Sequence, residues 1–230
     1  QKKNNNRMEF WYEKLGLELA DKIVSITSFN DEQIRLLSEG LKPCKRILDL
    51  GIGFGNLAKI LIERGKTVYG SDISEKSLEY AKKKIGKNIT EKLFLIKGDM
   101  RNLEYDQEFD GVSCVSNLAF PESELDNIVP GVYRALQNNG YFAITGIESS
   151  KEKIMEEIFT NDIQKALQEG KFSLTPEEIK KIGEVAHLLK QYQHKDSSQK
   201  IIAPLIKNNF KIERFEHFLQ DSCYFILAQK

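Results

Sequence analysis

The chain has 230 residues, which suits a single α/β domain because one hydrophobic core rarely grows beyond about 250 to 300 residues. Hydrophobic residues make up 40% and charged residues 30%, so a mainly disordered chain is not expected. Basic and acidic residues number 34 each, which argues against a protein whose affinity comes from a nucleic-acid backbone. We expect one folded domain and no nucleic-acid partner, although the composition still allows a local basic patch.

No apolar run is long enough to cross a membrane, and the first residues lack the apolar core of a signal peptide. The sequence thus predicts a soluble, cytoplasmic protein without a membrane span. The cysteines, Cys44, Cys114 and Cys223, lie far apart and form neither a disulfide framework nor a paired metal motif. We expect all three to be reduced core residues, and no residue spacing predicts a metal site.

Two helices are predicted first, in the segment 8–40. Residues 9–28 form an amphipathic pattern with an aromatic cluster, and residues 31–39 form a second helical pattern that ends at Gly40. Because the first methionine is Met8, residues 1–7 are kept out of the fold prediction.

Short apolar runs then alternate with helical patterns through the segment 44–148, which is typical of βαβ units and a parallel sheet. The predicted strands are residues 46–50, 67–71, 93–97, 111–115 and 141–145. The predicted helices are residues 56–64, 75–84 and 122–137. Ser74 and Pro121 stand where two of these helices begin, and right-handed crossovers would place helices on both faces of the sheet.

After the fifth predicted strand, residues 151–194 are helical in pattern and evenly charged in both signs. Their clearest boundary is Thr175-Pro176-Glu177-Glu178, which combines an N-cap threonine, a first-turn proline and a capping-box glutamate. The last segment, 198–230, predicts a short helix over 198–208 and a hairpin of strands 210–218 and 223–228, with its turn near Gln220 and Asp221.

A glycine-rich loop directly after the first predicted strand is the strongest functional signal. It reads Asp49-Leu50-Gly51-Ile52-Gly53-Phe54-Gly55 and leads into a helix. Dinucleotide-binding loops read GxGxxG and use the helix N-terminus for a pyrophosphate. Here the spacing is GxGxG, and an acid precedes the first glycine by two residues; that acid would repel a pyrophosphate but could hold the cationic amino group of an amino-acid moiety. The loop therefore favours S-adenosylmethionine over a nicotinamide cofactor.

Acids also follow the second and third predicted strands. Asp72 is placed to accept hydrogen bonds from ribose hydroxyls, a feature that dinucleotide enzymes share. Asp99 is placed to accept from the exocyclic amine of adenine. Each acid alone also fits a helix cap or a solvated turn. With Asp49 they form a constellation at three successive strand ends, which favours a nucleoside-containing ligand.

The segments DLGIGFGN, GSDIS, KGDMR, FDGVSCVSNLAF and ALQNNGYFAI resemble the successive motifs of class I, Rossmann-like, S-adenosylmethionine-dependent methyltransferases. The resemblance covers residues 44–148, and the terminal hairpin agrees with it. It is greatest to the group that acts on small molecules such as quinone precursors, amines and natural products. It implies a seven-stranded, mostly parallel sheet with an antiparallel C-terminal hairpin, helices on both faces and a helical lid after the fifth strand.

The resemblance also implies which residues bind S-adenosylmethionine and release S-adenosylhomocysteine. They are Asp49, Gly51, Gly53, Gly55, Asp72, Ile73, Asp99, Met100 and Asn117. Asp49 and the first two glycines would face the methionine part, and Asp72 with Ile73 the ribose and adenine. Asp99 and Met100 would meet the adenine edge, and Asn117 would lie beside the sulfonium.

Two departures narrow the chemistry. The fourth predicted strand ends in Ser116-Asn117-Leu118-Ala119-Phe120 and lacks the Asn/Asp-Pro-Pro-Tyr/Phe signature of many enzymes that methylate planar amino groups. Cys114 lies inside a strand, without the sequence context of a cytosine-methylating nucleophile. Nucleobase and glutamine amide acceptors, and a covalent mechanism, are therefore disfavoured.

Methyl transfer from a sulfonium depends mostly on proximity, alignment and the exclusion of water, and it needs a general base only when the acceptor is protonated. Tyr12 and Trp11 are candidates to close over the cofactor or to cage a cationic acceptor, or else they only pack their helix onto the domain. Glu148 is a candidate amine ligand or base, or a surface residue. His187 is a candidate base in a covered pocket, or a packed histidine. His194 and His217 are expected to be structural.

Three functions remain open. The first is methylation of O, N or C of a small organic acceptor, and the second is methylation of RNA or protein with the same cofactor. The third is a binding protein that keeps the fold without catalysis, against which the intact glycines and acids speak. Residues 151–195 are expected to cover the carboxyl end of the sheet as a lid; the alternative is a helical hairpin that forms a homodimer.

Overall fold

Seven strands form one sheet in the order β3-β2-β1-β4-β5-β7-β6. The structure is a computed structural model that describes residues 14–86, 91–116, 122–189 and 197–230. The strands are β1 (Arg46–Leu50), β2 (Thr67–Asp72), β3 (Leu93–Lys97), β4 (Phe109–Val115), β5 (Leu136–Ile147), β6 (Lys211–Phe218) and β7 (Cys223–Gln229). The first five pair in parallel, and β7 runs antiparallel to both β5 and β6. The predicted seven-stranded sheet with its antiparallel terminal hairpin is confirmed.

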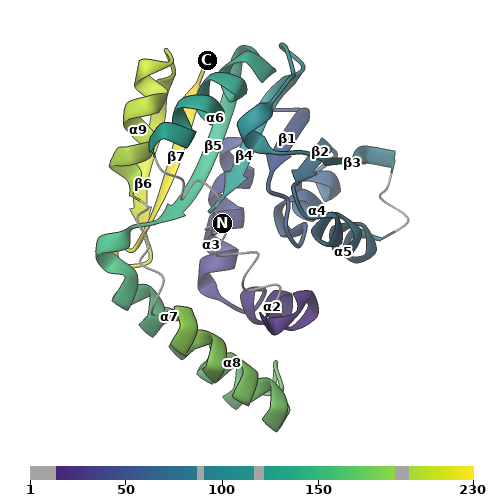
Figure 1. Cartoon of the computed structure of the whole chain (residues 1–230), viewed down its shortest axis with the longest axis vertical. Helices are drawn as coiled ribbons and strands as arrows, with labels where there is room; N and C mark the ends of the chain where they lie inside the picture. Colours follow the sequence, from purple (N-terminus) through teal and green to yellow (C-terminus); the bar gives the residue numbers. More distant parts are fainter. Residues whose placement is uncertain (1–13, 87–90, 117–121, 190–196) are drawn as a thin grey trace, which may run out of the picture.

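Helices cover both faces of this sheet (Figure 1). One face is covered by α3 (Ser28–Gly40), α4 (Asn56–Glu63) and α5 (Glu75–Ile85), and the other by α6 (Glu122–Ala135) and α9 (Ser198–Lys207). Strand residues alternate between the two cores, so Leu48 packs with the α6 side while Ile47 packs with the α3 side. Cys44, Cys114 and Cys223 are all buried in the core, as the sequence predicts, and none forms a disulfide bond with another described residue.

Side-chain caps set several helix boundaries and correct the first predicted helix. The Ser74 hydroxyl accepts from the backbone N–H of Ser77 at the start of α5. Thr27 caps α3 in the same way, because its hydroxyl accepts from the N–H of Asn30. A helix that continued to residue 28, as predicted, would lose this cap. Instead α2 (Leu17–Val24) ends four residues earlier, and the second helix begins at Ser28 rather than at residue 31.

The fifth strand also begins earlier than predicted. Leu136 already pairs with Phe109, and the register shifts before Gly111 pairs with Tyr141. The residues at this irregularity, 137–139, are exposed, and Asn139 has a left-handed φ of 63°. An Asn-Asn-Gly stretch is typical of a turn, so the first residues of this irregular strand show no strand pattern in the sequence. The predicted helix that ends at residue 137 is two residues too long, since α6 ends at Ala135.

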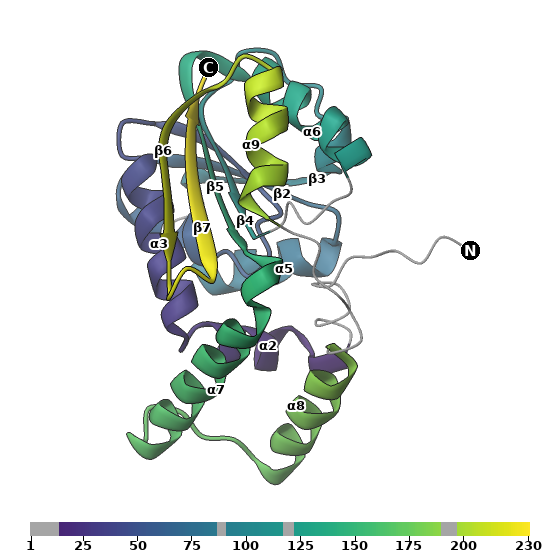
Figure 2. The same ribbon diagram turned by 90° about the vertical axis from the view of Figure 1, so that its left-hand side faces the viewer.

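Three helices form a separate layer below the carboxyl ends of the parallel strands (Figure 2). This helical tier consists of α2, α7 (Glu152–Gln168) and α8 (Pro176–Leu189), where α8 begins with the predicted capping box of Thr175 and Glu178. Its core contains Leu19 and Ile23 of α2, Ala166 of α7, and Phe54 from the glycine-rich loop. The segment after β5 therefore packs against the N-terminal helix and the loop.

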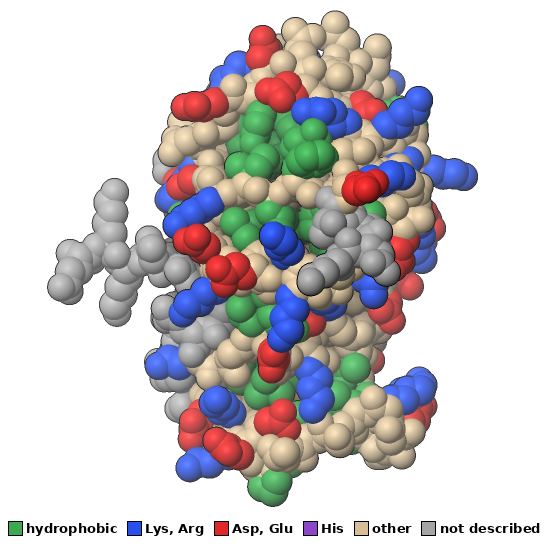
Figure 3. Space-filling model, turned by 90° about the vertical axis from the view of Figure 1, so that its right-hand side faces the viewer, with side chains coloured by type: hydrophobic (Ala, Val, Ile, Leu, Met, Phe, Trp, Pro, Cys, Tyr) green, Lys and Arg blue, Asp and Glu red, His purple; other side chains and the backbone are tan. Residues whose placement is uncertain are grey.

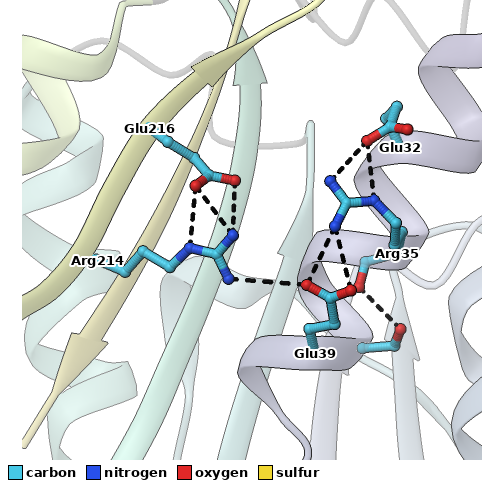
Figure 4. Close-up of polar contacts among 6 residues, drawn as sticks. Glu32, Arg35, Glu39, Arg214 and Glu216 are labelled. Carbon is cyan, nitrogen blue, oxygen red and sulfur yellow. Dashed lines mark hydrogen bonds and ion pairs between the residues drawn. The ribbon is translucent and has the colours of Figure 1, made fainter.

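Polar contacts dock α3 at both of its ends. At its start, Asp162 of α7 accepts hydrogen bonds from the backbone N–H and the hydroxyl of Ser28, at 2.8 and 2.7 Å. At its end, Glu39 lies 3.1 Å from a guanidinium nitrogen of Arg35 and 3.8 Å from one of Arg214 on β6 (Figure 4). The ion pairs at this second end are partly exposed, so each contributes less than about 1 kcal/mol. No helix in the described part of the chain has the length and apolar character of a membrane span.

Candidate functional site

The glycine-rich loop between β1 and α4 has a backbone conformation that residues with side chains rarely adopt. Gly51, Gly53 and Gly55 have φ values of 70°, 53° and 76°, in the left-handed region. The N–H groups of Gly51 and Ile52 both donate to the carbonyl of Ser71 at the end of β2. A Cβ on Gly55 would lie only 3.0 Å from Cδ1 of Ile85. The loop therefore presents bare backbone at the carboxyl end of the sheet, beside the N-terminus of α4.

Asp49 is a buried carboxyl group beside this loop. It is 1% exposed, and one of its oxygens accepts a hydrogen bond from the hydroxyl of Ser113 on β4 at 2.7 Å. Burial raises the pKa of Asp49 to about 6, against the lowering effect of the Ser113 hydrogen bond. A carboxylate in this setting is poorly solvated, so a cationic partner such as an amino group would stabilise its ionised form.

Asp72 lies at the end of the neighbouring strand and faces the same loop. Its carboxylate accepts from the backbone N–H of Gly53 at 3.0 Å and from that of Ser74 at 2.9 Å. Burial raises the pKa of Asp72 although these hydrogen bonds oppose the shift. A carboxylate can accept about four hydrogen bonds, so lone pairs remain for the hydroxyl groups of a ribose. Ile73, which follows, is 47% exposed and offers an apolar surface of the kind that a base can cover.

Asp99, the third predicted acid, is engaged by a neighbouring arginine. Its side chain accepts from the backbone N–H of Arg101 and from the guanidinium group, which also contacts Glu124 of α6. The guanidinium holds the pKa of Asp99 below its usual range. Met100 is partly buried against the α6-side core. A hydrogen bond from the amine of adenine to Asp99 would require Arg101 to give up part of this contact.

Glu148, a candidate amine ligand or base, contacts Ser198 and His217. It is buried after β5, and its Oε1 accepts from the N–H of Ser198 at 3.2 Å and lies 3.1 Å from Nε2 of His217. It thereby joins β5 to the start of α9 and to β6. Of the other candidates, Tyr12 and Asn117 lie outside the described residues, and only the backbone of His187, within α8, is described.

Sequence reasoning did not single out Gln33, a buried residue at the ends of β4 and β5. From α3, its Oε1 accepts from the hydroxyl of Ser116 at 3.1 Å and from that of Thr145 at 3.3 Å. Ser116, directly after β4, has a left-handed φ of 52°, and the two hydroxyl contacts join α3 to the ends of β4 and β5. The sequence did contain a signal for Gln33. It is a polar residue on the apolar face of α3, at helical spacing from the buried Phe29 and Leu36.

The structure brings Asp49 and Asp72 together around one glycine-rich loop. A buried acid, an acid with free lone pairs and bare backbone fit the amino group and the ribose of S-adenosylmethionine better than a pyrophosphate, which the acids would repel. Two surface grooves of about 500 and 430 Å³ lie elsewhere, between α2 and α8 and between α3 and α4, and neither is lined by these acids. Among the residues described, no group of histidine, cysteine or acidic side chains could hold a metal ion.

Comparisons with known proteins identify the same segment. The family model described as "Methyltransferase domain" matches residues 47–140. The ribosomal protein L11 methyltransferase of Listeria welshimeri is 32% identical over 146 residues, which are 60% of this chain and 44% of that protein. The chain spans about half the length of the curated relatives that it matches.

Solved structures share the fold over most of the chain. Magnesium protoporphyrin IX methyltransferase from Synechocystis PCC 6803, with bound S-adenosylhomocysteine, has a TM-score of 0.63 at 17% identity, covering 98% of this chain and 100% of that one. Geranyl diphosphate C-methyltransferase from Streptomyces coelicolor A3(2) has a TM-score of 0.61 at 11% identity, covering 86% and 80%. At these identities the likeness shows the fold alone. The family match over residues 47–140 shows a segment similar to a methyltransferase domain, which includes the glycine-rich loop after β1, and the sheet order with the solved structures shows the Rossmann-like fold of class I methyltransferases.

Proposed function

We propose that the chain transfers a methyl group from S-adenosylmethionine to an oxygen, nitrogen or carbon atom of a small organic acceptor. The observation that carries this proposal is the pairing of the buried Asp49 with Asp72 around a loop of bare backbone. When bound, the cofactor supplies an electrophilic methyl group for an in-line displacement. The residues of the chain then need only to bind, to align and to exclude water.

The proposed cofactor contacts follow the strand ends. Asp49, with the backbone of Gly51 and Gly53, would hold the methionine part, and Asp72 with Ile73 would hold the ribose and adenine. Met100 and Asp99 would meet the adenine edge, Gly55 would end the loop, and Asn117 would lie beside the sulfonium. A general base is needed only for a protonated acceptor, and Tyr12, Glu148 and His187 are the candidates; of these, Glu148 also contacts Ser198 and His217.

Two observations support a small acceptor. The helical tier stands at the carboxyl end of the sheet, where open α/β folds bind ligands, and a cover at this edge suits an acceptor that can be enclosed. Lysine and arginine side chains alternate with aspartate and glutamate on the face shown in Figure 3, without a continuous patch of one sign. A strongly basic surface, as used for nucleic acids, is not seen on this face.

A protein acceptor is the second candidate. It is favoured by the match to the ribosomal protein L11 methyltransferase, whose name states a protein substrate. That match covers 44% of the relative's length, so it supports shared cofactor chemistry more than a shared acceptor.

Calorimetry with S-adenosylhomocysteine, S-adenosylmethionine and NAD tests the proposed cofactor site. We expect both sulfur compounds to bind and NAD not to bind. Asp72→Ala should weaken binding by about 1.5 to 3 kcal/mol, because it removes charge-assisted hydrogen bonds. Gly53→Val should abolish binding, because a side chain would block the approach to the backbone. Unchanged affinity in both variants, or tight binding of NAD alone, would overturn the site assignment.

Labelled S-adenosylmethionine tests the acceptor class. The wild-type protein is incubated with a fraction of small metabolites and, separately, with purified ribosomal proteins. Label in the small-molecule fraction alone supports the proposal, and label on a ribosomal protein supports the second candidate. Cofactor binding without transfer to either fraction would favour a binding protein.

A further inference from the structure

A partly buried polar cluster joins four helices beside the glycine-rich loop. Asp21 of α2 accepts from Nζ of Lys84 on α5, at 2.5 and 2.7 Å to its two oxygens, and from the hydroxyl of Tyr80 at 2.9 Å. Nζ of Lys84 also donates to Oδ1 of Asn56, the first residue of α4. The amide nitrogen of Asn56 then donates to Oδ1 of Asn30 on α3 at 3.1 Å.

Lys84 is the centre of this cluster. An ammonium group has three donors, and the two oxygens of Asp21 and the amide oxygen of Asn56 account for all three. The side chains of Lys84 and Asp21 are only 23% and 9% exposed. Removing one partner would leave the other charge poorly solvated and without its counter-ion, so these partly buried charges constrain the geometry around them more than a surface ion pair would.

The cluster contacts the loop at its end. Asn56 directly follows Gly55, whose left-handed backbone packs against Ala81 of α5. The residue before that glycine, Phe54, packs edge to face with the Tyr80 ring, with 6.0 Å between centroids. Helix α5 thus contacts the residues on both sides of Gly55: Tyr80 packs against Phe54, and Lys84 donates to Asn56.

The other end of the cluster belongs to the helical tier. Leu19 and Ile23, on either side of Asp21 in α2, share a core with Phe54 and with Ala166 of α7. Helix α2 is therefore joined to the loop by apolar packing through Phe54 and by the ion pair between Asp21 and Lys84.

We propose that Asp21 and Lys84 are positioning residues that couple the docking of α2 to the geometry of the glycine-rich loop. This proposal rests on the cofactor site proposed above and adds residues to it that belong to neither the loop nor the strand ends. Coupling between two sites is reciprocal, so cofactor binding must strengthen the docking of α2 by the same factor by which docked α2 strengthens cofactor binding.

The chain provides a matched control on the same two helices. Lys83 of α5 pairs with Glu18 of α2 at 3.4 Å, and their side chains are 78% and 80% exposed. This pair bridges α5 and α2 like the pair of Lys84 and Asp21, but in the described part of the chain it makes no hydrogen bond or ion pair with Asn56 or Phe54. Lys83→Met and Glu18→Gln therefore remove an ion pair between these helices without disturbing the loop.

The test measures the affinity for S-adenosylhomocysteine by calorimetry in the wild type and in five variants. We expect Lys84→Met and Asp21→Asn each to weaken binding about tenfold, a usual size for coupling between sites, and Lys83→Met and Glu18→Gln to change it less than about twofold. Lys84→Arg, which keeps the charge, should restore part of the loss. If Lys84→Met does not fold, Asp21→Asn, which keeps the side-chain volume, gives the same comparison.

Hydrogen exchange separates positioning from a structural role. In the wild type and in Lys83→Met, S-adenosylhomocysteine should increase protection of residues 17–24, and in Lys84→Met this increase should be lost. A lower melting temperature with unchanged affinity and unchanged ligand-induced protection would overturn the proposal. Failure of the wild type to bind S-adenosylhomocysteine would instead overturn the proposed function, so the two failures are distinct.

Discussion

The carboxyl group of Asp49 makes stability depend on pH. Burial raises its pKa to about 6 from 3.8, so the folded state binds this proton more tightly than the unfolded state. The stabilising contribution of the proton is complete below about pH 4 and is lost as the pH rises through 6. At pH 7.5 the buried charge costs about 3 kcal/mol, from roughly two pKa units at 1.36 kcal/mol each.

Asp49→Asn, which carries no charge at any pH, should therefore gain stability over the wild type as the pH rises. We expect the difference in unfolding free energy, measured with urea, to shift by about 3 kcal/mol in favour of the variant between pH 4 and pH 7.5. Ser113→Ala keeps the carboxyl group but removes a hydrogen bond that lowers its pKa, so its stability should fall more steeply with pH. A difference between Asp49→Asn and wild type that stays constant with pH would contradict the burial argument.

Removing the hydroxyl of Ser77 should stabilise the protein, whereas most substitutions of buried residues destabilise it. This hydroxyl is buried on α5 and has no hydrogen-bond partner among the residues described. Because an unsatisfied buried hydroxyl is costly, Ser77→Ala should raise the unfolding free energy by about 1 kcal/mol. Ser74→Ala, three residues earlier, removes the helix cap and should lower it by about 1 kcal/mol. Urea unfolding of both variants checks the pair, and a loss of stability in Ser77→Ala would show that its hydroxyl has a partner.

Among the elements, α7 and α3 are joined by a cap supplied from far along the chain. Asp162→Ala removes an acceptor from the backbone N–H and the hydroxyl of Ser28, at the positive end of α3. We expect a loss of about 1 to 2 kcal/mol, measured by urea unfolding. Asn161→Ala, at an exposed position on the same turn, is the matched control and should change stability by less than about 0.5 kcal/mol. Equal effects of the two substitutions would mean that the cap contributes nothing specific.

Local sequence patterns predicted the elements whose boundaries are themselves local. The strands β1 and β3 begin and end at the predicted residues, because each is a mostly apolar run with a lysine before it and a glycine after it. The start of β5 was missed because its exposed Asn-Asn-Gly stretch reads as a turn. The break between α2 and α3 was predicted about four residues too late, because an amphipathic pattern continues past the end of α2. Both misses occur where a tertiary contact or a cap overrides the local pattern.

In the candidate site, the sequence predicted the acids and the glycines but not their partners. The placement of Asp49 and Asp72 follows from strand ends that a sequence pattern can locate. The engagement of Asp99 by Arg101 depends on rotamers, and the contact of Gln33 with Thr145 joins residues 112 positions apart. Such contacts depend on how whole helices pack on the sheet, and a short stretch of sequence does not contain that information.

At the scale of the whole molecule, we predict that the helical tier acts as a lid over the proposed cofactor site. Replacing residues 151–195 by a short linker should leave the binding of S-adenosylhomocysteine largely intact, because the proposed cofactor residues and the ion pair of Asp21 with Lys84 all lie outside this segment. It should eliminate methyl transfer to the native acceptor, because the proposed cover over the site is lost. Calorimetry measures the first outcome and transfer of labelled methyl the second; retained transfer would contradict a lid.

The alternative, in which residues 151–195 form a homodimer, makes a different prediction. Hydrogen exchange in this segment is compared at several protein concentrations, with and without S-adenosylhomocysteine and acceptor. A lid gains protection when ligands are added, at any concentration. Protection that depends on protein concentration and not on ligand would refute the lid and support dimerisation.

The place of β7 between β5 and β6 has a consequence for the kinetics of folding. Ile147, at the end of β5, pairs with Cys223, and residues 148–222 must loop out before the two meet. Closing so long a loop costs entropy before any pairing rewards it, so this strand is expected to join the sheet late. Until it does, β5 presents an apolar, unpaired edge to other unfolded chains. We expect the yield of refolding to fall as protein concentration rises, even where the finished sheet is stable.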